Sequence, residues 1–149
     1  PIREFAVSDQ PEVAPQIAEL IKMFPQIGFQ KVLGIEVVET VPDRAVVRLP
    51  HRMDLCGGGN ALHGGVISSM LDLTGALAAW SGHDIARGMK ASTVTLTVNF
   101  VGAAMGTAIL ATGEVRRRGK ELIFCDVKIV EDSDARRLVA TGSMIYRIV

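Results

Sequence analysis

The sequence has few cysteines, no excess of either charge and no long uninterrupted apolar run. Its two cysteines, Cys56 and Cys125, provide neither a disulfide framework nor a metal-ligand spacing. Sixteen basic residues balance sixteen acidic ones, whereas proteins that bind nucleic acid usually carry a basic excess. The longest apolar stretch, Val66 to Trp80, contains Asp72 and is too short to span a membrane. We therefore expect no nucleic-acid partner, no membrane partner and no metal.

The opening of the chain and its composition narrow the class of protein. No signal-peptide pattern precedes the first helix, so we expect a cytoplasmic protein with reduced thiols. Apolar residues make up 48% of the chain and charged residues 21%, which is typical of a globular protein. The length of 149 residues fits one domain. We predict that it covers residues 1–149, with an N-terminal helix and connector over about 1–30.

The hydrophobic pattern predicts a helix, two strands, a long helix and then four strands. Apolar residues at helical spacing indicate helices over residues 11–24 and 64–81, and the second is apolar on nearly every side. The strands are predicted at 35–41, 44–49, 92–101, 107–117, 121–131 and 137–147. Consecutive strands with short turns favour an antiparallel sheet, and a helix that apolar needs a sheet curled around it. The predicted class is α+β.

A glycine-rich stretch, Gly-Gly-Gly-Asn-Ala-Leu-His-Gly-Gly, lies at residues 57–65, directly before the long helix. Glycine lets a ligand approach the backbone closely, and a helix N-terminus offers free N–H groups with partial positive charge. Together they predict a site for an oxygen that becomes anionic during a reaction. Asp72 follows in the apolar helix, where a carboxylate is costly unless it is paired, hydrated or functional. A tightly packed helix start and a structural ion pair are the alternatives.

These features resemble the hotdog-fold acyl-CoA thioesterases, in particular the PaaI-type and 4-hydroxybenzoyl-CoA thioesterases. The resemblance rests on the triplet His63-Gly64-Gly65, the acid at Asp72 and the hydroxyl residue Thr93 near the start of the next strand. It implies a hotdog fold, in which an antiparallel sheet wraps around one long helix, and hydrolysis of an acyl-CoA thioester without a cofactor. It further implies a homodimer with shared active sites, and pairing of two dimers into a homotetramer.

The resemblance also implies a role for each of these residues. The Gly64 N–H would face the thioester carbonyl oxygen, with Gly65 beside it in the substrate-binding loop. Asp72 would lie across the dimer interface and act as general base or as nucleophile. Thr93 would assist the attacking water, and His63 would mainly support the loop.

One position departs from the family pattern. The subgroup usually has Asn or Gln six residues before the motif histidine, where this chain has Gly57. Asn60, three residues before His63, is a substrate-binding candidate that could take over the role of that amide. A more flexible loop is the other explanation.

The remaining candidates concern the two ends of the substrate. A basic cluster around a predicted hairpin turn, together with a lysine before the preceding strand, would bind the phosphates of coenzyme A. Its members are Arg116, Arg117, Arg118, Lys120 and Lys90. A solvated hairpin end is the alternative. The acyl group is expected in an apolar channel between subunits, near Met70, Leu73, Leu77 and Phe29.

Two other functions stay open at this stage. A non-catalytic acyl-CoA-binding protein is favoured by Gly57, whereas the retained Asp72 argues against it. A hotdog enoyl-CoA hydratase or dehydratase would use a histidine and an acid, and the His-Gly-Gly setting argues against it. Cys56, beside the glycines, is a further candidate nucleophile, although the sequence shows no histidine partner for it.

Overall fold

The structure, a computed structural model, describes residues 11–149, so the start of the predicted N-terminal segment, residues 1–10, lies outside the described residues. The α-helices are α1 (Pro15–Met23), α2 (Gly28–Leu33) and α3 (Gly64–Ser81), and short 3₁₀ helices lie at Phe24–Gln26, Met53–Leu55 and Ile85–Arg87. The strands are β1 (Glu36–Val41), β2 (Arg44–Leu49), β3 (Ala91–Phe100), β4 (Ile109–Arg118), β5 (Leu122–Glu131) and β6 (Leu138–Ile148). The predicted order of the two main helices and six strands is confirmed, and the structure adds the short helix α2 in the segment that the sequence predicts as a connector.

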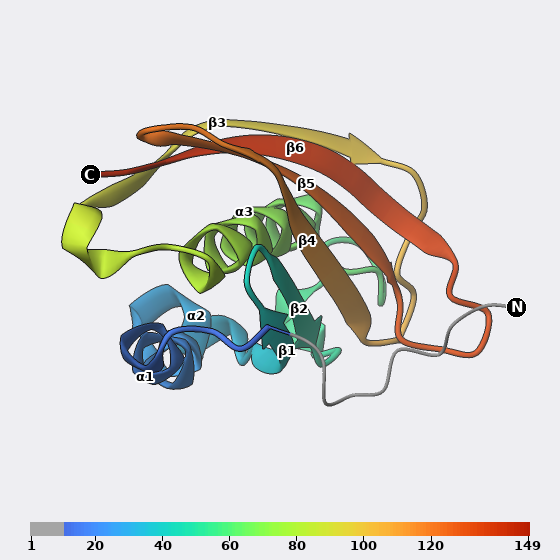
Figure 1. Cartoon of the computed structure of the whole chain (residues 1–149). Helices are drawn as coiled ribbons and strands as arrows, with labels where there is room; N and C mark the ends of the chain where they lie inside the picture. Colours follow the sequence, from blue (N-terminus) through green and yellow to red (C-terminus); the bar gives the residue numbers. More distant parts are fainter. Residues whose placement is uncertain (1–10) are drawn as a thin grey trace, which may run out of the picture.

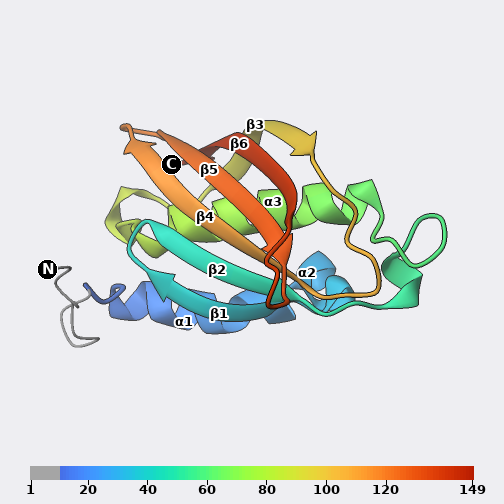
Figure 2. The same ribbon diagram turned by 90° about the vertical axis from the view of Figure 1, so that its right-hand side faces the viewer.

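The six strands form one antiparallel sheet in the order β1-β2-β4-β5-β6-β3. The sheet curls around α3, and α1 and α2 lie on the side of α3 away from β3 and β6 (Figures 1 and 2). The predicted α+β class, with an antiparallel sheet wrapped around one long helix, is therefore confirmed. Among residues 11–149, none of the helices combines the length and the apolar character required to cross a bilayer.

Helix α3 begins and ends where the sequence predicts, and it forms the centre of the core. Eleven of its 18 residues are buried, including Met70, Leu71 and Leu77 with no exposed surface. Burying a side chain of this size contributes about 1.5–3 kcal/mol relative to leaving it in water. Burial of these side chains explains why a helix that is apolar on nearly every side is stable inside the sheet.

Glycines let α3 lie very close to the sheet. A Cβ atom at Gly75 in the helix would overlap the side chain of Met144 in β6. A Cβ atom at Gly142, also in β6, would overlap the side chain of Leu71. Since Leu71 and Gly75 lie on either side of Asp72 in the chain, these two contacts fix the depth of the helix segment that carries the acid.

Strand β3 forms one edge of the sheet and is largely exposed. Its apolar residues Val94 and Phe100 are 53% and 57% exposed, respectively. An edge strand of ten residues with exposed apolar side chains offers unpaired N–H and C=O groups to another strand. The other edge strand, β1, has only six residues and is bent by a bulge.

A bulge in β3 changes which face Thr93 occupies. Strict alternation predicts that Thr93 and Leu96 point to opposite sides of the sheet. The pairing of β3 with β6 shifts between Thr93 and Thr95, so Val94 is an extra residue. Thr93 consequently pairs with Tyr146 and faces α3. Only this displacement makes the side chain available to Asp72.

Candidate active site

The N-terminus of α3 holds one backbone N–H group ready for a ligand. His63 is the N-cap residue, and its Nδ1 accepts a hydrogen bond of 2.9 Å from the Gly65 N–H. The N–H groups of Val66 and Ile67 donate to the His63 carbonyl oxygen. Within residues 11–149 the Gly64 N–H donates to no protein acceptor. It therefore remains free where the partial positive charge of the helix is concentrated.

The same hydrogen bond defines the chemical state of His63. Because Nδ1 accepts a hydrogen bond from the Gly65 N–H, the ring proton of a neutral His63 imidazole lies on Nε2. His63 is thus committed to holding the helix start, and this position agrees with the supporting role that the resemblance implies.

Asp72 and Thr93, predicted as a catalytic pair, lie in direct contact. The Thr93 hydroxyl donates a hydrogen bond of 2.6 Å to Asp72 Oδ1. Asp72 is half-buried and Thr93 is exposed, so the carboxylate borders on solvent on the side of β3. A hydroxyl that donates to the carboxylate keeps its own lone pairs for a water molecule. The pair can hold and activate a water next to the open edge of the sheet.

Tyr146 is a third residue at this place, and sequence reasoning missed it. It lies opposite Thr93 in β6, and its hydroxyl accepts a hydrogen bond of 3.3 Å from Trp80 Nε1. Burial raises the pKa of Tyr146, the Trp80 hydrogen bond partly offsets that rise, and the negative charge of Asp72 adds to it. A tyrosine in the last strand has no sequence signal that connects it to Asp72.

Gly64 and Asp72 of one chain do not face the same point. They lie eight residues apart on one helix, which is about 12 Å along the helix axis at 1.5 Å per residue. A reacting carbonyl needs its oxygen within about 3 Å of the N–H donor and its attacking water beside the acid. Gly64 and Asp72 of one chain are therefore too far apart for both to contact one reacting carbonyl group.

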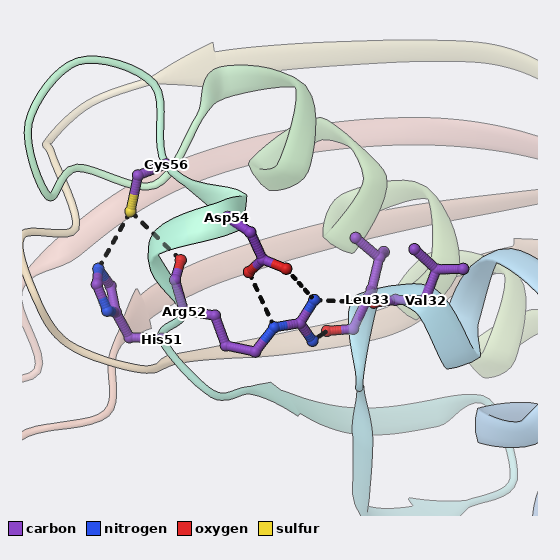
Figure 3. A network of polar contacts seen from close by, with 6 residues as sticks. All are labelled: Val32, Leu33, His51, Arg52, Asp54 and Cys56. Atoms are coloured by element: carbon purple, nitrogen blue, oxygen red, sulfur yellow. Dashed lines mark hydrogen bonds and ion pairs between the residues drawn. The ribbon is translucent and has the colours of Figure 1, made fainter.

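The loop before α3 is fixed by a contact that the sequence does not reveal (Figure 3). His51 Nε2 lies 2.9 Å from the Asn60 carbonyl oxygen and 3.3 Å from Cys56 Sγ. The thiol donates to the Arg52 carbonyl oxygen at 3.4 Å. The sequence shows no histidine partner for Cys56, and the structure supplies one, because a 3₁₀ turn folds residues 51 and 56 together. Through His51 the contact connects Cys56 and Asn60, which lie on either side of the three glycines at 57–59 in the glycine loop.

Arg52 connects this loop to the preceding helix (Figure 3). Its guanidinium donates to the carbonyl oxygens of Val32 and Leu33, at the C-terminal end of α2, and to the Asp54 carboxylate. The hydrogen bond from Arg52 lowers the pKa of Asp54. A cation at the C-terminal end of a helix also complements the helix dipole.

The glycine at position 57 leaves room for the motif histidine. A Cβ atom there would lie only 3.3 Å from Cδ2 of His63, so a side chain at position 57 would require the imidazole to move by a few tenths of an ångström. The Asn60 side chain lies against Gly106, where an added Cβ would be 2.9 Å from Asn60 Nδ2. The structure thus places the Asn60 amide beside the 101–106 loop.

The basic candidates separate into paired and unpaired side chains. Arg116 forms ion pairs with Asp126 at 2.7 Å and with Glu114 at 3.4 Å. Arg118 pairs with Asp43 and also donates to the Ala79 carbonyl oxygen near the end of α3. Arg117, Lys120 and Lys90 form no ion pair with another described residue.

Two of the residues expected around an acyl channel are in fact core residues. Met70 and Leu77 have no exposed surface and pack inside the sheet, so the expectation that they line a channel is wrong. Leu73 is half-buried, and Phe29 is 54% exposed on α2. The apolar character of α3 reflects its central position, which sequence periodicity cannot distinguish from a ligand-binding face.

A metal site does not emerge from the part of the chain that the structure describes. No group of three or more His, Cys, Asp or Glu side chains in residues 11–149 is arranged to hold a metal ion.

Comparison with solved structures defines the class of protein. The structure of the *Escherichia coli* PaaI protein superimposes with a TM-score of 0.79 at 24% identity, covering 93% of this chain and 96% of that one. At this identity the similarity shows the fold, and the wrapped helix and strand order are those of the hotdog fold.

Sequence comparison then defines the family. The family model of the Thioesterase superfamily matches residues 59–137, a segment that contains Gly64, Asp72 and Thr93. A candidate esterase of *Saccharolobus solfataricus* is 32% identical over 120 residues, 80% of this chain and 81% of that protein. The acyl-coenzyme A thioesterase PaaI of *Escherichia coli* is 28% identical over 109 residues, 72% of this chain and 74% of that protein. The chain belongs to the thioesterase superfamily, and the predicted resemblance to PaaI-type hotdog thioesterases is confirmed.

Proposed function

We propose that this protein hydrolyses an acyl-CoA thioester to the free acid and coenzyme A. The observation that carries the proposal is the free Gly64 N–H at the start of a helix whose only carboxylate, Asp72, is held by Thr93. The family supports thioester hydrolysis, and the name of the *Escherichia coli* relative supports coenzyme A as the thiol.

In the proposed reaction the thioester carbonyl oxygen accepts a hydrogen bond from the Gly64 N–H. Asp72 removes a proton from water as the water oxygen attacks the carbonyl carbon, and the negative charge moves to the carbonyl oxygen. The carbon–sulfur bond then breaks, and the thiolate of coenzyme A leaves. Alternatively, an Asp72 oxygen attacks first, and water cleaves the resulting anhydride. In both routes Thr93 orients the water, and neither route requires a metal or redox cofactor.

The proposed active site is shared between two copies of the chain. Thr93 lies beside Asp72, and the Phe100 ring lies beside Gly64, so the two halves of the site occupy opposite ends of β3. If two β3 strands pair antiparallel with Thr93 opposite Phe100, each Asp72 approaches the Gly64 of the other copy. The exposed length of β3 supports this pairing. Pairing of two such dimers into a tetramer is part of the proposal.

The proposal places the coenzyme A phosphates near the hairpin between β4 and β5. Arg117 and Lys120, together with Leu122 and Phe124, line a shallow pocket of about 380 Å³ there. Unpaired cations can bind phosphate without first breaking an ion pair, which favours Arg117, Lys120 and Lys90 over Arg116 and Arg118.

Release of free thiol from a panel of acyl-CoAs tests the proposal directly. The panel contains short, medium, long and aromatic acyl groups, and wild type is compared with Asp72→Asn. We expect the variant to lose about 10²–10⁴-fold in rate, because a positioned general base contributes that much. Asp134→Asn, an exposed acid in the turn after β5, is the matched control and keeps wild-type activity. Full activity of Asp72→Asn would exclude the assigned role.

The same panel, with a 2-enoyl-CoA added, separates the other two functions. Tight binding of an acyl-CoA without thiol release would indicate a binding protein. Loss of enoyl absorbance from a 2-enoyl-CoA, again without thiol release, would indicate a hydratase.

A further inference from the structure

A small apolar groove lies directly beside the free N–H of Gly64. It has a volume of about 390 Å³ and opens to solvent. Its lining consists of Leu62, Gly64, Ile67, Phe100, Val101, Gly102 and Ala103. None of these residues has a polar or charged side chain, so the groove offers hydrogen bonds only through its backbone. The Gly64 N–H therefore lies at the margin of a surface that is otherwise suited to hydrocarbon.

Phe100 forms the wall of the groove that faces α3. A Cβ atom at Gly64 would lie 3.4 Å from Phe100 Cε1 and 3.6 Å from Cζ, so the ring covers the first turn of the helix. The ring is nevertheless 57% exposed, and the adjacent Val101 is equally exposed. In the proposed dimer the second β3 strand lies next to this groove, and an apolar group bound in it would cover the side chains of Phe100 and Val101 that remain beside the free donor.

We infer that this groove binds the acyl chain of the substrate and that Phe100 determines which chain lengths the enzyme accepts. The inference rests on the proposed function, because the Gly64 N–H fixes the carbonyl and thereby the first carbon of the acyl chain. The pantetheine arm of coenzyme A is the other group attached to the carbonyl through sulfur. It carries two amides, which would lose hydrogen bonds to water in a groove without polar side chains. The acyl chain is the part of the substrate that matches the groove.

The size of the ring at position 100 should then control selectivity. Replacing Phe100 with alanine lengthens the groove and favours longer chains, and replacing it with tryptophan shortens the groove and favours shorter ones. In an apolar pocket, small differences in chain length change selectivity by about 10–200-fold. We expect the ratio of kcat/KM for decanoyl-CoA to kcat/KM for butyryl-CoA to rise about tenfold in Phe100→Ala and to fall about tenfold in Phe100→Trp. The change should appear mainly in KM, because the acyl contacts exist in both ground and transition states.

The experiment measures thiol release from the two substrates by wild type and the Phe100 variants. In parallel, calorimetry measures the binding of two non-hydrolysable analogues, one with a short and one with a long alkyl chain. Both are 2-oxoalkyl thioethers of coenzyme A, which keep a carbonyl group but have no thioester bond. Phe29→Ala removes an equally exposed ring from α2, the position that the sequence favoured for the acyl channel. Val38→Ala on β1 is the control for loss of an exposed apolar side chain elsewhere. Phe100→Leu replaces the alanine variant if that variant does not fold.

Opposite shifts of the kcat/KM ratio in Phe100→Ala and Phe100→Trp, with a wild-type ratio in Val38→Ala, would establish the inference. A folding defect would lower the activity toward both substrates alike and leave the ratio unchanged. Hydrolysis with unchanged ratios in every Phe100 variant would overturn it and leave the proposed function intact, as would a shift confined to Phe29→Ala. Analogue binding that shifts with Phe100, without hydrolysis by wild type, would support the groove and contradict the thioesterase proposal.

Discussion

The two halves of the candidate site are built in different ways. The Gly64 half is fixed within the chain: His63 caps the helix, and His51 holds the glycine loop through Asn60. The Asp72 half depends on one hydrogen bond from Thr93, which lies on an exposed edge strand. A backbone N–H cannot adjust its direction without moving the chain, so it requires a rigid loop. A carboxylate can adjust, and in the proposed dimer its final position depends on the strand that pairs with β3.

Removing the backbone N–H of Gly64 should have a large effect on activity and tests the role of the rigid half of the site. Gly64→Pro deletes the N–H, and proline suits the first position of a helix. His63 already has φ −63° and ψ 141°, the conformation that a residue before proline prefers. We expect kcat to fall about 10²–10³-fold, as when other oxyanion donors are removed. Steady-state thiol release measures the loss.

Gly64→Ala is the matched control for that substitution. It keeps the N–H, and its Cβ would meet Phe100 at 3.4 Å, an ordinary van der Waals contact. We expect the alanine variant to retain activity within a few-fold of wild type. Equal losses in both variants would mean that the N–H is not the oxyanion donor.

Mixing two inactive variants tests whether the two halves of one site come from different copies of the chain. If each site combines Gly64 of one copy with Asp72 of the other, a mixed dimer of Gly64→Pro and Asp72→Asn chains contains one intact site. Random exchange of subunits should restore about a quarter of wild-type activity, because half of the dimers are mixed and each has one working site. Refolding the chains together and then separately, followed by the thiol assay, provides the test. If the mixture stays inactive, each chain holds a complete site or none.

The smallest expected effect concerns the surroundings of Asp72. Tyr146 is the only tyrosine, so absorbance of its phenolate reports one group. Burial and the Asp72 charge raise its pKa, and Asp72→Asn should lower that pKa relative to wild type by removing the charge. A raised folded-state pKa gives stability that is complete below the unfolded value near 10 and lost as pH rises through the folded value. Spectrophotometric titration of both proteins measures the difference, and identical curves would place Asp72 too far away to act on Tyr146.

Sequence patterns predicted the elements that depend on local chemistry. Helix α3 was predicted from Gly64 to Ser81 because its apolar residues are nearly continuous and a glycine-rich stretch precedes it. The choice of Thr93 as a site residue followed from the resemblance alone, since alternation along β3 placed Thr93 on the face opposite to Leu96, and its contact with Asp72 was not predicted. The extra residue at Val94 cannot be detected in the sequence, because threonines and apolar residues continue to alternate through the position of the bulge.

Contacts between elements were beyond the sequence. Three consecutive arginines read as one basic cluster, yet the pairing of β4 with β5 shifts between Val115 and Arg117, so Arg116 is an extra residue and no longer shares a face with Arg118. Arg116 is consequently paired with acids on β4 and β5, whereas Arg118 reaches the end of α3. The pair His51 and Cys56 was hidden for a similar reason, because a 3₁₀ turn of three residues determines their approach.

The close seating of α3 on the sheet has a consequence for how variation in this protein should be interpreted. Gly75 and Gly142 touch no substrate in the proposed reaction, but any larger side chain there would push the helix away from β6. The displaced helix would carry Asp72 with it, out of reach of a carbonyl held by the other copy. In a mutational scan for activity, both glycines should therefore be as intolerant of substitution as Asp72, the proposed general base. The positions sensitive to mutation would then include residues that set the distance between helix and sheet as well as residues that take part in the reaction.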